Sequence, residues 1–145
     1  MNYTLSELKI LVNNISKKVK LGTIIYLKGE LGTGKTAIVK FLIENLFKNS
    51  KKKNPIVTSP TFNIVQYYQV NKRLMIAHYD LYRLKKSSDI DNIGLYDLED
   101  NMINIIEWPE LITKKHKNRI EIKLKYTKKN NERKVSIKYF GSIKG

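Results

Sequence analysis

Residues 29–36 read Gly-Glu-Leu-Gly-Thr-Gly-Lys-Thr (GELGTGKT) and match the phosphate-binding pattern G-x-x-x-x-G-K-[ST] at every fixed position. The apolar run TIIYL at residues 23–27 comes before it and predicts a short buried strand. After it, apolar residues recur at three- and four-residue steps from residue 38 to 47, which is the period of one helix face. The pattern therefore joins a strand to a helix. In this setting backbone amides turn toward a phosphate, and the helix N-terminus adds partial positive charge.

The polar residues of such a loop predict a nucleotide and a metal ion. Lys35 would reach the β and γ phosphates, and the Thr36 hydroxyl would be a ligand of Mg²⁺. GTPases usually read guanine through N-K-x-D, but the Asn-Lys pair here continues as NKRL at residues 71–74. Residues 91–94 (DNIG) match the D-x-x-G switch of GTPases, yet a polar segment precedes them in place of a strand. We therefore predict ATP and Mg²⁺ as ligands.

The rest of the chain alternates helical and strand-like patterns. An amphipathic helix is predicted over residues 5–19, and Thr4 and Glu7 supply the S/T-x-x-E capping pattern at its start. Strand-like runs occupy residues 63–70, 74–79, 102–107, 120–126 and 135–140. The first two runs and the last two are close enough in sequence to form hairpins. Helices interleaved with buried strands predict an α/β sandwich, which we place in one domain spanning residues 1–145.

Two acids follow predicted strands. Asp80 ends one strand and Glu107 another, and ligands of open α/β sheets gather at the carboxyl ends of strands. Each acid also has a simpler interpretation: Asp80 could cap the turn that follows it, and Glu107 could be a surface carboxylate. Ser59 and Thr61 flank a proline in a loop where a hydroxyl could sense the γ-phosphate, although Ser-Pro often only begins a turn.

Three neighbours of these acids have open roles. His78 could be a base, but a single histidine among apolar residues is more often structural. Arg83 could pair with Asp80 or hold a phosphate. Trp108, the only tryptophan, could pack in the core, exclude water beside Glu107 or stack on a base of a partner.

The composition limits the function further. The formal net charge is +15, but 24 of the 28 basic residues are lysine, and 14 Asn and 19 Ile accompany them. A/T-rich codons encode all three residue types, so base composition and an RNA-facing surface both remain explanations of the charge. The absence of cysteine excludes disulfides and thiolate chemistry. No apolar run reaches the length of a membrane span and the N-terminus has no signal-peptide character, so we expect a cytoplasmic protein with no membrane partner.

Four motifs together resemble the signatures of one family. They are GELGTGKT at residues 29–36, SPTFNIV at 59–65, HYDLYR at 78–83 and IIEWPE at 105–110. In order and spacing they are similar to those of the TsaE (YjeE) family of bacterial P-loop ATPases, which take part in threonylcarbamoyladenosine modification of tRNA. The resemblance runs from about Thr4 to the final hairpin. Its departures, such as Thr33 in place of the usual Ala, remove no phosphate or metal ligand.

The resemblance implies a three-layer P-loop fold with a mixed sheet, ATP and Mg²⁺ as ligands, and TsaD and TsaB homologues as partners, with tRNA reached through that complex. It implies a catalytic set of Glu107, Asp80 and Lys35, and a metal set of Thr36, Glu107 and Asp80. The implied nucleotide contacts are Gly32, Thr33, Gly34, Lys35, Thr36, Ala37, Thr61 and, from the closing hairpin, Arg133. Ser59, Thr61, Arg83 and Trp108 are the implied switch or partner residues.

Two other functions share the phosphate loop. A small-molecule kinase would need an acceptor site and usually an arginine-bearing lid. A chain of 145 residues with four arginines has little room for either. A nucleotide-gated binding module would use ATP only to set its shape. We expect an ATPase, weak alone and activated by its partners.

Overall fold

The computed structural model describes residues 1–48, 50–60, 62–97 and 101–143. The strands are β1 (Asn2–Thr4), β2 (Ile24–Lys28), β3 (Val65–Gln69), β4 (Met75–Asp80), β5 (Met102–Glu107), β6 (Arg119–Tyr126) and β7 (Glu132–Phe140). The helices are α1 (Leu5–Ser16), α2 (Lys35–Phe47) and α3 (Ser88–Asn92), with 3-10 turns η1 (Leu95–Asp97) and η2 (Pro109–Leu111). Thr61 lies outside the described residues, so its expected switch role remains a prediction.

The described strands form one mixed sheet in the order β1-β7-β6-β2-β5-β4-β3. β2 pairs in parallel with both β5 and β6, and β4 pairs in parallel with β5. The other pairings are antiparallel: the hairpins β3–β4 and β6–β7, and β1 beside β7. The predicted α/β class, the mixed sheet and the C-terminal hairpin are confirmed.

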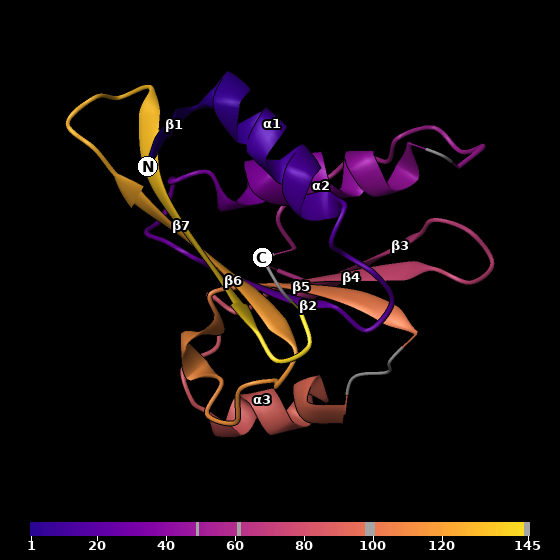
Figure 1. Ribbon diagram of the computed structural model, residues 1–145. Helices are drawn as coiled ribbons and strands as arrows, with labels where there is room; N and C mark the ends of the chain where they lie inside the picture. Colours follow the sequence, from indigo (N-terminus) through magenta and orange to yellow (C-terminus); the bar gives the residue numbers. More distant parts are fainter. Residues whose placement is uncertain (49, 61, 98–100, 144–145) are drawn as a thin grey trace.

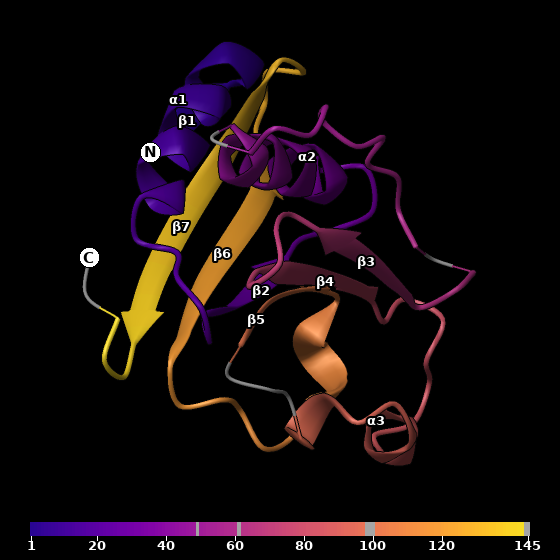
Figure 2. The same ribbon diagram turned by 90° about the vertical axis from the view of Figure 1, so that its right-hand side faces the viewer.

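Helices cover both faces of the sheet, which makes three layers (Figure 1). α1 and α2 lie together on one face, and α3 lies on the other. In Figure 2 the long strands β6 and β7 run beside α1 and α2, and α3 lies across the sheet from them. Because the central strands β2, β4 and β5 are covered on both faces, they are buried along almost their whole length.

The core has one apolar cluster on each face. The cluster under α1 and α2 includes Ile25, Leu27, Ile76, Ile105 and Ile122. The cluster on the α3 face includes Ile24, Tyr26, Ala77, Tyr79 and Ile106. Alternate residues of one strand thus belong to opposite faces, as the pleat requires. The same alternation puts His78, Asp80 and Glu107 on the face that carries α2.

Local chemistry accounts for the start of α1. The Thr4 side chain accepts a hydrogen bond from the Glu7 amide, and the Glu7 carboxylate accepts one from the Thr4 amide, so the predicted capping box is confirmed. The helix ends at Ser16, earlier than the residue 19 expected from periodicity. Within the described residues no helix is long and apolar enough to cross a membrane.

β1 has no counterpart among the predicted strands. Its three residues pair with β7, Asn2 opposite Lys134 and Thr4 opposite Glu132. A strand this short carries no pattern of its own, and its partner lies at the other end of the chain. The pairing therefore could not be found from local sequence.

Candidate nucleotide-binding site

The loop between β2 and α2 has the backbone shape that its glycines predict. Gly29, Gly32 and Gly34 have φ values of +154°, +80° and +110°, which side-chain-bearing residues rarely adopt. The Thr33 hydroxyl donates to the Glu30 carbonyl at 2.7 Å and closes the loop on itself. A Cβ built on Gly34 would meet no atom within 4 Å, so the start of α2 stays open to a ligand.

Lys35 begins α2 and lies buried beneath this loop. Its ammonium donates to the carbonyls of Gly29 at 2.5 Å and Glu30 at 3.1 Å. The same ammonium lies 3.8 Å from the centroid of the Trp108 ring, a cation–π contact. Burial lowers the pKa of Lys35, and the negative charge of Glu107 opposes that shift. The loop thus holds a desolvated cation where a phosphate would sit.

Glu107 faces the first turn of α2 from the end of β5. Only 2% of its surface is exposed, so the interpretation as a surface acid is wrong. The Thr36 hydroxyl lies 3.3 Å from Glu107 Oε1 and 3.4 Å from Oε2. On the other side His78 Nε2 lies 2.5 Å from Glu107 Oε2. The carboxylate is therefore held between the P-loop threonine and a fully buried imidazole.

His78 was expected to be structural or a base, and its contact with Glu107 indicates that it orients the acid. The side chain is 0% exposed, and its Nδ1 has no hydrogen-bond partner among the described residues. One signal in the sequence could have placed it: His78 precedes Asp80 by two residues, so both side chains lie on the same face of β4.

Asp80 pairs in register with Glu107 across the parallel strands β4 and β5. Its Oδ2 accepts a hydrogen bond from the Ser59 hydroxyl at 2.6 Å, and its Oδ1 accepts one from the Tyr82 amide at 3.0 Å. The turn-capping interpretation and the placement beside Glu107 are therefore both correct. Ser59, predicted for the switch loop, is anchored to the site by this bond.

Comparisons with known proteins identify the family of this chain. The model of the family described as "Threonylcarbamoyl adenosine biosynthesis protein TsaE" matches residues 3–135. The chain belongs to the TsaE family. A TsaE of Rickettsia typhi is 36% identical over 135 residues, which cover 91% of this chain and 88% of that protein. A TsaE of Aquifex aeolicus is 39% identical over 101 residues, 69% of this chain and 68% of that protein.

Not every TsaE relative is matched along its whole length. The alignment with the Rickettsia felis protein is 36% identical and covers 73% of this chain but only 59% of that relative. Among solved structures, Bacillus subtilus YdiB superposes with a TM-score of 0.69 over 97% of this chain and 86% of its own, at 23% identity. At that identity the likeness concerns the fold.

The C-terminal hairpin of this family member contacts the phosphate loop from outside. The Tyr126 hydroxyl donates to the Leu31 carbonyl at 2.6 Å, and Arg133 Nε donates to the Thr33 carbonyl at 3.1 Å. The Arg133 guanidinium also lies over the Tyr126 ring, 4.7 Å from its centroid. Arg133 was expected at the nucleotide, and the structure places it against the loop that would hold the nucleotide. Sequence reasoning missed Tyr126, because only the fold brings it to Leu31.

The two remaining predicted residues, Trp108 and Arg83, each contact an aromatic ring. Trp108 has a left-handed backbone, with φ +59°, and its ring packs 4.9 Å from the Tyr82 ring as well as over Lys35. It therefore combines packing with a place in the site. The Arg83 guanidinium lies over the Phe62 ring, 5.1 Å from the centroid, a contact that neither expected role included.

The oxygen ligands at this site fit Mg²⁺. Among the described residues no group of three or more His, Cys, Asp or Glu side chains could hold a metal alone. In phosphate sites, however, Mg²⁺ keeps several waters and takes one or two protein oxygens together with the phosphates. The Thr36 hydroxyl and the Glu107 carboxylate are adjacent to each other and are hard oxygen ligands of that kind.

Proposed function

We propose that this TsaE-family protein binds ATP with Mg²⁺ at residues 29–37, hydrolyses it, and serves in this way the biosynthesis of threonylcarbamoyladenosine in tRNA. The observation that carries the proposal is the position of Glu107, a buried acid in contact with both the P-loop Thr36 and His78. A buried carboxylate is costly unless it has such partners, and it lies where a phosphate-bound cation requires an acid.

Different residues of the site would bind the phosphates and the metal ion. Backbone amides from Gly32 to Ala37 and the N-terminus of α2 bind the phosphates, and the Lys35 ammonium balances their charge. Thr36 and Glu107 hold the metal ion, with Asp80 next to Glu107 in register. When bound, Mg²⁺ would neutralise charge that develops on the transferred phosphoryl group.

Glu107 and Asp80 are also the groups available to orient the attacking water. Hydrolysis needs such a group because the metal and the loop alone only bind the phosphates. The Trp108 ring lies over the Lys35 ammonium and packs against the Tyr82 ring, and it would limit the access of bulk water to the γ-phosphate.

The partners that fit this role are homologues of TsaD and TsaB. Hydrolysis would drive the cycle of the transferase that they form, and the chain would be a weak ATPase without them. Support comes from the family match over residues 3–135.

Two substitutions test the catalytic assignment. Glu107→Ala is expected to keep ATP affinity within a few-fold and to abolish hydrolysis, whereas Lys35→Ala should lose both, because Lys35 acts on phosphates throughout and Glu107 mainly in the transition state. Hydrolysis is measured alone, with the TsaD–TsaB pair, and with the pair plus tRNA. Normal turnover by Glu107→Ala with partners present would refute the role of Glu107. Nucleotide binding without turnover under all three conditions would instead indicate a passive switch.

A further inference from the structure

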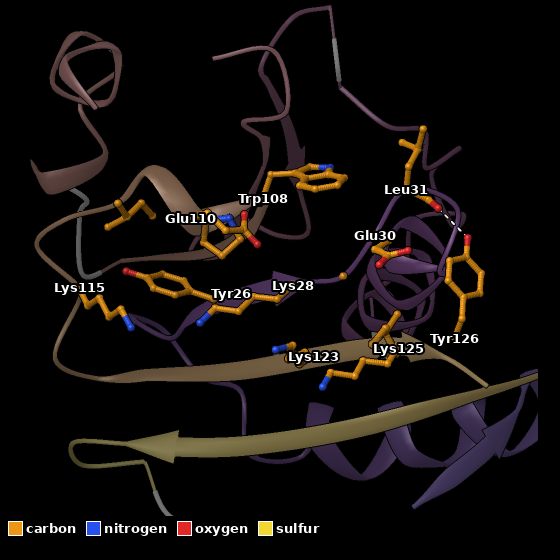
Figure 3. A pocket seen from close by; sticks show the side chains of 14 residues that line it. Tyr26, Lys28, Glu30, Leu31, Trp108, Glu110, Lys115, Lys123, Lys125 and Tyr126 are labelled. Atoms are coloured by element: carbon orange, nitrogen blue, oxygen red, sulfur yellow. Dashed lines mark hydrogen bonds between the residues drawn. The ribbon is translucent and has the colours of Figure 1, made fainter. Parts of the chain in front are cut away.

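A cavity of about 910 Å³ lies on the side of the sheet away from α2 (Figure 3). Its floor includes Tyr26, which belongs to the apolar cluster on the α3 face. β6 contributes Lys123 and Lys125, which alternate with Leu124 of the opposite cluster and therefore point to this side. Pro109 of η2 also lines the cavity. The cavity therefore lies mainly on the α3 face, although residues of the phosphate loop form part of its wall.

Lysines from three segments line this cavity. Lys28 comes from β2, Lys123 and Lys125 come from β6, and Lys115 comes from the loop after η2 (Figure 3). Lys28 is paired with Glu121 at 3.2 Å. In the described part of the chain the other three have no ion pair, and all three are exposed.

The charge of the cavity favours an anionic occupant. Two carboxylates, Glu30 and Glu110, also line it, so the lysines outnumber the acids four to two. With Lys28 already paired to Glu121, three lysines remain against these two acids. A concave surface with excess charge of one sign focuses its field on ligands of the other sign, here within a chain of net charge +15.

We infer that this cavity binds the phosphate backbone of RNA directly. Lysine ammoniums act as point charges that neutralise phosphates without reading bases, which suits positioning contacts. The rings of Trp108 and Tyr126 also line the cavity, and lysines interleaved with aromatic rings are typical of surfaces that bind single strands. The family to which the chain belongs acts in tRNA modification, so RNA is the polyanion that the protein would meet.

The cavity also adjoins the proposed ATP site. Residues Gly29, Glu30 and Leu31 form part of its wall, and the carbonyls of Gly29 and Glu30 hold the Lys35 ammonium. Trp108 lines the cavity and contacts that same ammonium. RNA in the cavity would therefore lie against the phosphate loop from outside. RNA binding does not depend on ATP hydrolysis, so either proposal can fail alone.

The test compares two double variants of the full chain that lose the same charge. Lys123→Gln with Lys125→Gln removes the β6 lysines from the cavity. Lys51→Gln with Lys53→Gln removes two exposed lysines beyond the C-terminal end of α2, a helix about 20 Å long that begins at the phosphate loop. Unmodified tRNA with a fluorescent label is titrated with each protein at several salt concentrations, and anisotropy reports binding.

The cavity variant should bind tRNA about tenfold more weakly, and the slope of log K against log salt should fall by about 1.4 to 2 in magnitude. The affinity of the control variant for tRNA should stay within about twofold of that of the unsubstituted protein, because the lysines it loses would contact no phosphate. Trp108 fluorescence with ATP should be the same in both variants, which shows that each is folded and that the nucleotide site is intact.

Equal weakening by the two double variants would overturn the inference, since diffuse charge would then explain the binding. Unchanged tRNA binding by the cavity variant would overturn it as well. Poly-glutamate is titrated in parallel, because an acidic protein segment is the alternative anionic occupant. If the cavity variant loses poly-glutamate binding but keeps tRNA binding, the occupant is an acidic protein segment and the RNA assignment is wrong.

Discussion

His78 Nε2 lies 2.5 Å from Glu107 Oε2, and both side chains are buried on the face of the sheet that carries α2. An ionised carboxylate only accepts hydrogen bonds, so the imidazole is the donor. The bond fixes one oxygen of Glu107 while Thr36 approaches both oxygens. The orientation of the proposed catalytic acid therefore depends on a residue of a neighbouring strand.

Replacing His78 should impair turnover more than binding. In His78→Leu the carboxylate loses its donor, and hydrolysis should fall about 10- to 100-fold, the usual effect of removing a group that orients a metal ligand. His78→Gln retains an amide donor and should recover part of the rate. The measurements are kcat, KM for ATP, and MgADP affinity by Trp108 fluorescence. A His78→Leu protein with unchanged kcat would mean that the bond is only structural.

Two loop glycines should respond differently to alanine. A Cβ on Gly29 would lie 2.7 Å from Thr33 Oγ1 and 3.0 Å from the Leu124 carbonyl, whereas a Cβ on Gly34 would meet nothing within 4 Å. Both positions carry the strain of a positive φ, and only Gly29→Ala adds overpacking, typically about 1–3 kcal/mol. Urea unfolding should therefore show Gly29→Ala to be the less stable variant. Equal midpoints would indicate that the loop relaxes around the new methyl group.

The bond from Tyr126 to the Leu31 carbonyl should stabilise the phosphate loop. Tyr126→Phe removes the hydroxyl donor and should cost about 1 kcal/mol of unfolding free energy. ATP affinity should fall a few-fold, because the loop would have to be ordered on binding. Tyr139→Phe, on the adjacent strand β7, is the matched control, since its hydroxyl has no hydrogen bond among the described residues. Similar losses in both variants would argue against a specific role of Tyr126.

Stability should fall when His116 becomes protonated. Its Nδ1 lies 2.6 Å from the Tyr26 hydroxyl and its Nε2 lies 2.7 Å from the Leu95 carbonyl, a pattern that suits a neutral ring. Burial lowers the pKa of His116 from 6.5. The unfolded chain thus binds the proton more readily, and the stabilising contribution, present above about pH 6.5, is lost as the pH falls below it.

Thermal unfolding between pH 7.5 and 5.5 measures this effect. His116→Gln should show a smaller decrease of Tm over that interval than the unsubstituted chain does. Identical pH profiles of Tm would show that His116 does not contribute to the pH dependence of stability.

Much of the fold follows from local sequence patterns. The apolar period predicted both long helices, and the alternating or continuous apolar runs predicted β2 to β7, because each of these elements buries a face that the spacing of its residues reveals. The strand ends at Asp80 and Glu107 were predicted for the same reason. The three-residue β1 was missed, since its only partner is β7 at the other end of the chain.

The sequence by itself determined the phosphate loop, since the glycines, Lys35 and Thr36 are contiguous and their chemistry depends on local backbone shape. It also determined that acids would gather at one edge of the sheet. Only the tertiary structure decided what holds those acids and that loop. His78 reaches Glu107 across 29 residues, and Tyr126 reaches Leu31 across 95. Such contacts depend on strand order and register, which are set by the packing of the whole sheet and have no local signature in the chain.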